Sequence, residues 1–486
     1  MQGRKISYVS SFFYLVFALS LSCSDTQNPG NIRTLRASRE ASPGLEEKVI
    51  SHYNERGTLT AVTDYNSTNY FIYRGEPMGY QFELLNLLAE HLDLNLNIIV
   101  NNDLEESFDC LVNGQCDLLA KNVTITRERS RLMDFTLPHN QTRQVLIQRK
   151  PEKWQYMTES EREGHMIRTL LDLGGKTVHV QRNSAYASRL RNLVDEIGDT
   201  IIIVEVGDVP EQLITMVAEG EIDYTVSDEN IAMVNRTYHD NIDIETAISF
   251  SQNLAWAVKK GDNHLRDSIN RWLGNFKNTI EYRLLYAKYF RNQRSAWMVQ
   301  SDFYVLASGR ISPYDELMKK YSEEIGWDWR LLASMVYQES NFRHDVESWA
   351  GARGLMQLMP GTANRFGVID INNPEENIRA GVRYIAWLDD ILSDRIPARE
   401  ERIKFILASY NVGLGHVLDA RALARKYERD PDRWTGSVDY FILNKSNPDY
   451  FLDPVVRHGY ARGQEPYNYV GEILERYEHY KNIIAE

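Results

Sequence analysis

The sequence predicts a multidomain protein in which an N-terminal α/β domain of two lobes is followed by an all-α domain. At 486 residues, the chain is longer than one compact core normally allows. Strand and helix patterns alternate through its first half, which favours a mainly parallel sheet. Helical periodicity alone fills residues 311–486. The composition, 43% hydrophobic and 25% charged, is typical of folded, soluble domains.

The first 23 residues are expected to be an export signal that is not part of the fold. A short basic region precedes an apolar or small-residue stretch at 7–22, which is too short for a comfortable membrane span. Cys23 follows directly, and the segment resembles the lipidation site of bacterial lipoproteins, although Ser20 stands where leucine is usual. A plain secretory signal or an uncleaved anchor is the alternative. Ser24, in place of aspartate, favours the outer over the inner membrane, with the protein facing the periplasm.

Residues 24–50 are polar, contain proline and glycine and have no periodicity, so we expect a flexible tether. The other two cysteines, Cys110 and Cys116, lie close together in the sequence. An exported protein permits a disulfide between them, and free buried thiols are the alternative.

Charge and ligand patterns disfavour two classes of function. The formal net charge is −13, so the chain has no overall basic field for binding the phosphates of nucleic acid. No set of cysteines and histidines has metal-ligand spacing, and we expect neither a metal nor a cofactor. A neutral polymer such as a glycan stays compatible with this balance.

The first folded domain is expected at 51–292. Its strand–helix–strand unit begins with β-rich, helical and alternating segments at 57–63, 79–92 and 94–100. Two blocks of this kind, about 57–150 and 170–245, predict two lobes. A strand and a helix within A-W-A-V-K-K-G-D-N-H-L-R-D-S-I-N-R-W-L, residues 255–273, are expected to return and close the domain.

The stretch N-V-T-I-T-R-E-R-S-R-L-M-D-F-T-L-P, together with G-T-L-T-A-V-T and G-G-K-T-V-H-V-Q-R-N-S-A-Y, resembles the periplasmic solute-binding domains that capture amino acids between two lobes. The resemblance implies that Arg129 clamps the α-carboxylate of a ligand with its forked guanidinium and that Thr124 adds a hydroxyl. Ser184, at a helix N-terminus, would hold the same anion, and Asp228 would accept the ligand's amine. The alternatives are a solvated arginine at position 129 and simple helix caps at positions 184 and 228.

A linker is expected at 293–310, and an all-α domain at 311–486. One helix has a clear start, because Asn373 is a capping residue, Pro374 suits the first turn and Glu376 has the spacing of a capping box. Its inward stripe is expected to contain Ile378, Val382, Ile385 and Leu388.

Another helix, ending near residue 340, carries a carboxylate on its apolar face. Counted from Leu332, the positions i+3, i+4 and i+7 are Met335, Val336 and Glu339. A helix C-terminus disfavours an anion, and burial disfavours it further. Both effects would raise the pKa of Glu339 and supply a proton for acid catalysis. The alternative is a glutamate that leans out into water.

Four short motifs follow one another along the helical domain: E-S at 339–340, G-L-M-Q at 354–357, A-S-Y-N at 408–411 and Y-V at 469–470. They resemble the lysozyme-like domain of soluble-type lytic transglycosylases, which cut peptidoglycan, with Ser409 where alanine is usual. The resemblance implies that Glu339 first protonates the glycosidic oxygen. It would then take the proton of the C6 hydroxyl of N-acetylmuramic acid, which closes a 1,6-anhydro ring without a second carboxylate.

The same resemblance gives supporting roles to further residues. Ser340 would orient the glutamate or the leaving sugar, Met356 and Gln357 would line sugar subsites, Tyr410 would hydrogen-bond near Glu339, Asn411 would contact the substrate or support its helix, and Tyr469 would close the cleft. For Met356, Tyr410 and Tyr469, core packing is the alternative.

The combination of both domains behind a lipoprotein signal resembles the membrane-bound lytic murein transglycosylases of the F type. It implies a lipid-anchored enzyme that cuts glycan strands, with an N-terminal domain that binds an amino acid or muropeptide and modulates activity. Two alternatives are a hydrolytic, lysozyme-type muramidase and an anchored amino-acid or peptide binding protein or sensor with an idle second domain.

Overall fold

The structure is a computed structural model that describes residues 57–290 and 309–484, apart from residues 127 and 238. The export signal with Cys23, the tether and nearly all of the linker at 293–310 lie outside the described residues. The predictions for those segments therefore stay predictions.

A mixed sheet of six strands forms the first lobe of the N-terminal domain. Its strands are β1 (Thr58–Thr63), β4 (Asn95–Val100), β5 (Leu118–Thr124), β6 (Met133–Phe135), β7 (Asn140–Thr142) and β13 (Gln252–Lys259). The order is β4-β1-β5-β13-β6, and β7 also pairs with β13. β1, β4 and β5 are parallel, whereas β13 is antiparallel to β5, β6 and β7.

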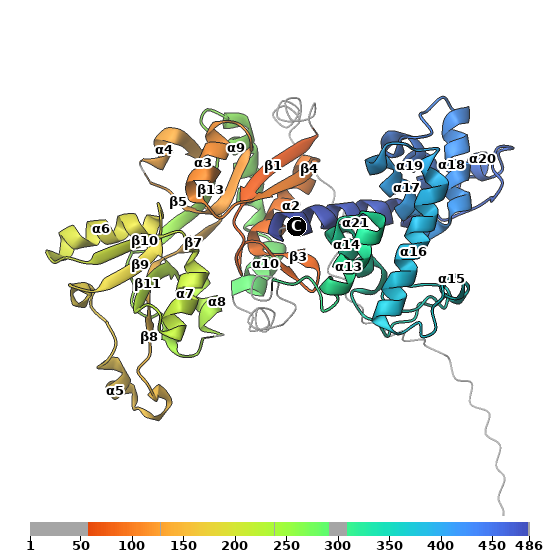
Figure 1. Cartoon of the computed structure of the whole chain (residues 1–486). Helices are drawn as coiled ribbons and strands as arrows, with labels where there is room; N and C mark the ends of the chain where they lie inside the picture. The colour runs from red at the N-terminus through yellow and green to blue at the C-terminus, as the bar shows by residue number, and fades with distance from the viewer. Residues whose placement is uncertain (1–56, 127, 238, 291–308, 485–486) are drawn as a thin grey trace, which may run out of the picture. The chain divides into compact units, whose positions relative to one another are not determined.

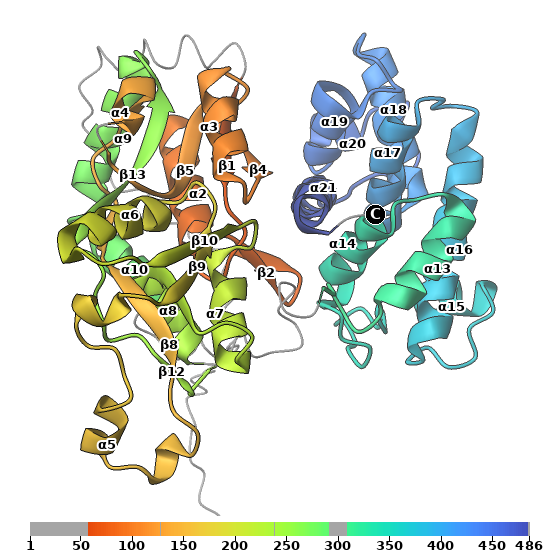
Figure 2. The same ribbon diagram turned by 60° about the vertical axis from the view of Figure 1, so that its left-hand side comes forward.

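A five-stranded sheet forms the second lobe. Its strands are β8 (Gln144–Arg149), β9 (Thr177–Gln181), β10 (Ile202–Val206), β11 (Tyr224–Asp228) and β12 (Ile242–Asp243). The order is β10-β9-β11-β8-β12, with β9 parallel to both of its neighbours and β8 antiparallel to β11 and β12. A loop with the 3₁₀ turn Trp154–Tyr156 and the short helix α5 (Glu159–Glu163) extends beyond this sheet (Figures 1 and 2).

The chain passes between the lobes twice, once between β7 and β8 and once between β12 and β13. The returning strand and its closing helix are confirmed as β13 and α9 (Asn263–Phe276). The predicted block boundary near residue 150 is wrong, because β8 belongs to the second sheet. The sheets are also mixed rather than mainly parallel. Alternation along the sequence shows that a strand exists, but long-range pairing decides which sheet it joins.

Helices cover both faces of each sheet, as the alternation along β8 shows. Leu146 packs in a cluster with α6, whereas Val145 and Ile147 pack on the opposite face with α7 and α8 (Figure 1). In the first lobe, α2, α9 and α10 cover one face and α3 covers the other. The helices are α2 (Tyr80–Leu92), α3 (Leu104–Val112), α4 (Arg129–Leu132), α6 (Ala185–Ile197), α7 (Pro210–Glu219), α8 (Glu229–Arg236) and α10 (Ile280–Phe290), with a 3₁₀ turn at Leu170–Leu173.

Two smaller features complete the N-terminal domain. A short hairpin of β2 (Phe71–Tyr73) and β3 (Glu76–Met78) precedes α2. Cys110 at the end of α3 and the buried Cys116 both carry free thiols, so the free-thiol alternative describes this structure.

The C-terminal domain is helical, as predicted, and packs around one core. Its elements are α13 (Asp315–Ile325), α14 (Trp329–Ser340), α15 (Pro360–Arg365), α16 (Pro374–Ser393), α17 (Arg399–Val412), α18 (Leu414–Lys426), a π-helical turn (Trp434–Val438), α19 (Asp439–Leu443), α20 (Pro448–Phe451) and α21 (Gln464–Ile483). Figure 2 shows α16 and α17 side by side, with α14 and α21 beside them.

The start of α16 follows the prediction in part. Asn373 caps the helix, since its side chain accepts from the Glu376 backbone N–H at 3.0 Å. The Glu376 carboxylate does not close the capping box but accepts from the N–H groups of Ile369 and Asp370. The predicted inward stripe is confirmed, with each of its four side chains at most 1% exposed.

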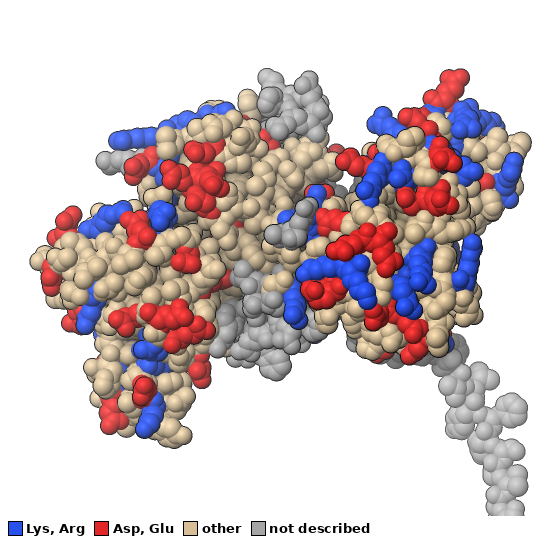
Figure 3. All heavy atoms as spheres, viewed as in Figure 1, with Lys and Arg blue, Asp and Glu red and all other residues tan. Residues whose placement is uncertain are grey.

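Within the described residues, no helix combines the length and apolar character that crossing a membrane requires. Acidic and basic side chains are interspersed on the face drawn in Figure 3, and no broad basic surface stands out there.

Candidate active site and ligand pocket

Glu339 lies in the last turn of α14, a helix whose residues 329–337 are all buried. Asp328 caps the N-terminus of the helix by accepting from the Arg330 N–H, and Asn341 ends it in the left-handed conformation at φ 51°. α21 lies against α14, where the Ser334 hydroxyl donates to the Ile473 carbonyl at 2.7 Å. The sequence stripe is therefore confirmed, and it delivers one carboxyl group to the contact between two packed helices.

The Glu339 carboxyl group has a single hydrogen-bond partner among the described residues, the Tyr469 hydroxyl of α21, which donates to Oε1 at 2.5 Å. Burial raises the pKa of Glu339 to about 7, although the hydrogen bond from Tyr469 works in the opposite direction. The negative charge of Glu465 adds a smaller upward effect. The raised pKa agrees with the expectation from the sequence and leaves the group able to carry or release a proton near neutral pH.

Tyr410 is partly buried near Glu339, whose charge contributes to raising the pKa of this phenol. Its hydroxyl donates to the Met356 carbonyl at 2.8 Å rather than to the glutamate. The direct hydrogen bond to Glu339 thus comes from Tyr469, for which the sequence predicted only closure of a cleft. The roles of the two tyrosines therefore differ from those predicted. Tyr469 contacts the Glu339 carboxyl group, whereas Tyr410 anchors the G-L-M-Q loop beside it.

The remaining predicted residues have mainly supporting positions. Ser340 is buried and donates back to the Val336 carbonyl at 3.1 Å rather than to Glu339, and its expected role toward the leaving sugar stays a prediction. Met356 is fully buried against Gly381, which is the core-packing alternative. Gln357 has a left-handed φ of 43°, and its amide donates to the Gly354 carbonyl at 2.9 Å. Asn411 is partly exposed near the end of α17.

Two residues at this site, Glu465 and Asn377, were not predicted from the sequence. Glu465 is exposed in the first turn of α21, one helical turn before Tyr469, and this i, i+4 spacing is visible in Q-E-P-Y-N-Y. Asn377 is a fully buried amide on the inward face of α16. It accepts from the Met356 N–H and donates to the carbonyls of Arg353 and Ile371, which fixes the G-L-M-Q loop on both sides.

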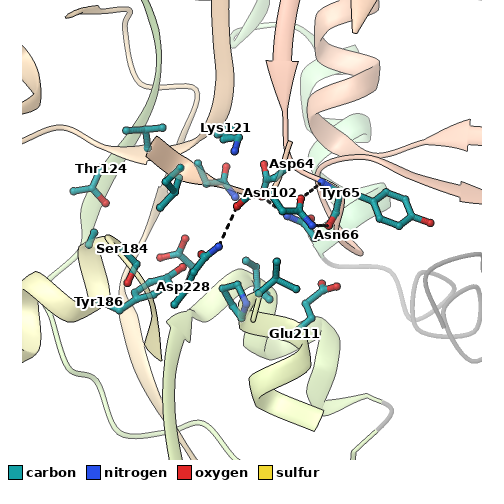
Figure 4. Close-up of a pocket in the computed structure, with 18 of the residues that line it drawn as sticks. Asp64, Tyr65, Asn66, Asn102, Lys121, Thr124, Ser184, Tyr186, Glu211 and Asp228 are labelled. Atoms are coloured by element: carbon teal, nitrogen blue, oxygen red, sulfur yellow. Dashed lines mark hydrogen bonds between the residues drawn. The ribbon is translucent and has the colours of Figure 1, made fainter. Parts of the chain in front are cut away.

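The N-terminal domain contains a pocket of about 730 Å³, its open mouth included, between its two lobes. All four predicted ligand residues, Thr124, Arg129, Ser184 and Asp228, line it. In Figure 4, Ser184 and Asp228 of the second lobe lie across the pocket from Lys121 of the first. The predicted ligand residues, which lie far apart in the sequence, therefore come together in one pocket.

Arg129 has a guanidinium group that forms no salt bridge with a described residue, although the charge of Glu128 acts on it. Its Nη1 donates to the Thr124 carbonyl at 3.2 Å, and its guanidinium lies 5.2 Å from the ring centre of Phe108. No acidic side chain of the described residues forms an ion pair with it, and burial lowers its pKa. A desolvated guanidinium of this kind favours an incoming anion. The Thr124 hydroxyl, expected to help, donates to Gln252 at 3.2 Å.

The two residues from the second lobe differ in their role as caps. Ser184 caps α6, since its Oγ accepts from the Ala187 N–H at 3.3 Å, and it also lines the pocket. Asp228 occupies the N-cap position of α8, but its carboxylate accepts no capping hydrogen bond. Asp228 is 4% exposed, and burial raises its pKa to about 7. The cap alternative is therefore wrong for Asp228, whose carboxyl group faces the pocket.

Three charged residues of the pocket were not predicted: Asp64, Lys121 and Glu211. Glu211 is buried, and its carboxyl group accepts a hydrogen bond from the Ser67 N–H at 2.9 Å. Burial raises the pKa of Glu211 to about 7. Lys121 donates to the Asn101 carbonyl at 2.6 Å, and burial lowers its pKa. Asp64 directly follows G-T-L-T-A-V-T and Lys121 directly precedes N-V-T-I-T, so these two motifs could have drawn attention to them, whereas Glu211 lies on α7 outside the quoted motifs.

Comparison with known proteins identifies both domains. Residues 59–292 match the model of bacterial extracellular solute-binding proteins, family 3, and residues 316–432 match the transglycosylase SLT domain. Among solved structures, a mutant of ArgBP from T. maritima is 24% identical with a TM-score of 0.43, covering 50% of this chain and 99% of its own. The protein thus joins a solute-binding domain to a transglycosylase domain.

Several relatives that match nearly the whole chain share one name. The membrane-bound lytic murein transglycosylase F of Desulfosudis oleivorans is 35% identical over 87% of this chain and 90% of the relative. Its namesake from Pseudomonas fluorescens Pf0-1 is 31% identical over 88% and 86%, and that of Idiomarina loihiensis 28% over 91% and 94%. The chain belongs to the membrane-bound lytic murein transglycosylase F family.

Proposed function

We propose that the chain cleaves the β-1,4 bond between N-acetylmuramic acid and N-acetylglucosamine in peptidoglycan without consuming water, for turnover and remodelling of the cell wall. The observation that carries this proposal is the single carboxyl group of Glu339, with a pKa near 7 and a hydrogen bond from Tyr469. In its protonated form, Glu339 gives its proton to the glycosidic oxygen as the bond breaks. The resulting carboxylate takes the proton of the C6 hydroxyl, whose oxygen bonds to C1 and closes the 1,6-anhydro ring.

The positions of the nearby carboxylates support a mechanism with one acid. Glycosidases that hydrolyse the bond commonly use two carboxyl groups on either side of it. Glu347, downstream of Glu339, is paired with Arg353 at 2.9 Å on an exposed turn. Glu465 acts on Glu339 through its charge, and it is the residue to replace when the hydrolytic alternative is tested.

A digest of purified sacculi separates the two chemistries. Anhydro products are lighter by one water than the reducing-end products of a hydrolase, so mass spectrometry of wild-type digests decides between them. Glu339→Gln is expected to release neither. A digest with reducing ends that also depends on Glu465 would replace this proposal with the lysozyme-type alternative.

We further propose that the N-terminal pocket binds an amino acid or the end of a wall peptide and thereby modulates cleavage. Arg129, helped by Thr124 and Ser184, suits a carboxylate, and Asp228 suits an ammonium group across the pocket. Calorimetry with single amino acids and with a muropeptide tests binding. Cleavage rates with and without the bound compound test modulation, and equal rates at saturation would reject it.

Anchoring is proposed at Cys23, with the outer membrane as the destination. The sequence around this cysteine supports the proposal, and the relatives are named membrane-bound. Cys23→Ala is expected to move the protein from the outer-membrane fraction to the soluble periplasmic fraction. Retention of the variant in the membrane fraction would contradict a lipid anchor.

A further inference from the structure

Trp349 is the most exposed large apolar side chain in the described part of the chain, at 99% of its possible area. An indole has one of the largest apolar surfaces among side chains and usually buries much of it. A tryptophan left wholly in water would gain this burial by stacking on a partner.

The tryptophan sits on an ordered turn. Residues 346–354 form a hairpin, here called the tryptophan hairpin, with Trp349 at its tip. The Ser348 N–H donates to the Ala352 carbonyl at 2.8 Å, and the Ala352 N–H donates to the Ser348 hydroxyl at 3.0 Å. The Gly351 N–H donates to the Ser348 carbonyl at 2.9 Å, and Gly351 has a left-handed φ of 86°. The backbone that carries the indole is thus ordered by hydrogen bonds within the turn, so little backbone entropy is lost when the indole binds.

The base of the tryptophan hairpin is joined to the loop beside Glu339. The Gly354 N–H and the Gln357 amide both donate to the Val346 carbonyl at 3.2 Å. One residue earlier in that loop, the Met356 carbonyl accepts from Tyr410, the phenol that is affected by the charge of Glu339. Hydrogen bonds therefore connect the base of the tryptophan hairpin to this loop, and the loop to Tyr410, which lies near the Glu339 carboxyl group.

We propose that Trp349 forms a sugar subsite, stacking its indole on a pyranose ring of the glycan strand some distance from the bond that is cleaved; this rests on the proposed function. In β-1,4-linked sugars the substituents are equatorial, so each ring presents an apolar C–H face that suits an aromatic surface. The charges next to the indole balance each other in the Glu347–Arg353 pair, which fits an uncharged partner. A strand longer than the cleaved disaccharide has further rings to place on such a surface.

Binding is measured without turnover, in the Glu339→Gln background, by sedimentation with purified sacculi and by titration with an N-acetylglucosamine hexamer. Trp349→Ala is expected to weaken sacculus binding about three- to tenfold, the range that an aromatic stacking contact contributes. Trp349→Tyr should retain most of the affinity. Phe250→Ala, which removes a 93% exposed aromatic from the N-terminal domain, is the matched control and should change nothing.

In the active enzyme, Trp349→Ala should raise KM for sacculi with little change in kcat, because the indole holds the strand and does not touch the reacting atoms. Unchanged sacculus binding by Trp349→Ala would overturn the proposal, as would an equal loss in Phe250→Ala. A loss of binding to lipid vesicles with sacculus binding intact would assign the indole to a membrane instead. Cleavage by the wild type tests the proposed function separately, since the binding assay does not depend on turnover.

Discussion

Glu339 and Asp228 are a partly buried and an almost fully buried carboxyl group whose pKa is raised to about 7 for the same physical reason, the loss of water around the charged form. Their surroundings differ. Glu339 contacts a tyrosine hydroxyl and has no cationic partner among the described residues. Asp228 likewise has a hydrogen bond with a tyrosine, Tyr186. However, it faces a pocket that also contains Arg129, Lys121 and two further carboxylates.

The difference teaches what a raised pKa can be used for. A carboxyl group that meets only neutral donors can give up its proton and take another within one reaction, since neither form is locked by a charge. A carboxyl group in a pocket open to ligands is stabilised as an anion as soon as a ligand ammonium arrives. Burial alone therefore does not distinguish an acid catalyst from a ligand-binding group; the neighbouring charges do.

The strongest test of the comparison exchanges the two carboxyl groups for amides. Glu339→Gln is expected to lower cleavage of sacculi by about a thousandfold or more, since general acid–base catalysis contributes roughly 10²–10⁴-fold and this group performs both proton transfers. Asp228→Asn, the matched change in the other domain, should retain cleavage without ligand. Release of soluble muropeptides measures both, with thermal unfolding as a check on folding. Equal losses in the two variants would erase the distinction.

The second test concerns the guanidinium group of Arg129. Arg129→Ala is expected to weaken binding of single amino acids about ten- to a hundredfold, the range for a charge-assisted hydrogen bond to a carboxylate. Arg131→Ala removes an exposed arginine from the same short helix and should have little effect. Isothermal titration calorimetry provides both values. Similar affinities for the two variants would show that Arg129 is not the carboxylate clamp.

The sequence predicted the local features well. The cap of α16 depends on residues three apart, and the stripe that ends in Glu339 depends on one helical repeat, so both are visible in a short window. The order of the motifs also placed Tyr410 and Tyr469 near the right site. Which of the two donates to Glu339 depends on how α17 and α21 pack, and no local pattern contains that information.

Features set by distant segments were missed or misplaced. β8 was put in the wrong lobe because its partners β11 and β12 lie some 75 or more residues further along the chain. Glu211 was not predicted as a pocket residue because it reaches the pocket from α7, which carries none of the quoted motifs. Trp349 has no helical or strand periodicity, and its exposure can be seen only in the folded domain.

The third test uses pH to sharpen the comparison in the pocket. The free carboxyl group of Asp228 must lose its proton before it can pair with a ligand ammonium. Affinity for an amino acid should therefore be constant above about pH 7 and fall below it, by up to about tenfold per pH unit. Asp228→Asn should remove this slope. Glu211 titrates in the same range, so Glu211→Gln is the matched control; a slope lost in that variant alone would assign the proton to Glu211.

The smallest expected effect is a shift in the pH profile of cleavage. Because Glu339 must start protonated, kcat/KM should fall as pH rises through about 7. Tyr469→Phe removes a hydrogen bond that favours the carboxylate, so the falling limb should move to higher pH. Glu465→Gln removes a repelling charge, so the limb should move to lower pH. At pH 8 each change corresponds to about two- to threefold in rate relative to each variant's own plateau. Shifts in the same direction would mean that neighbours other than these two govern the Glu339 proton.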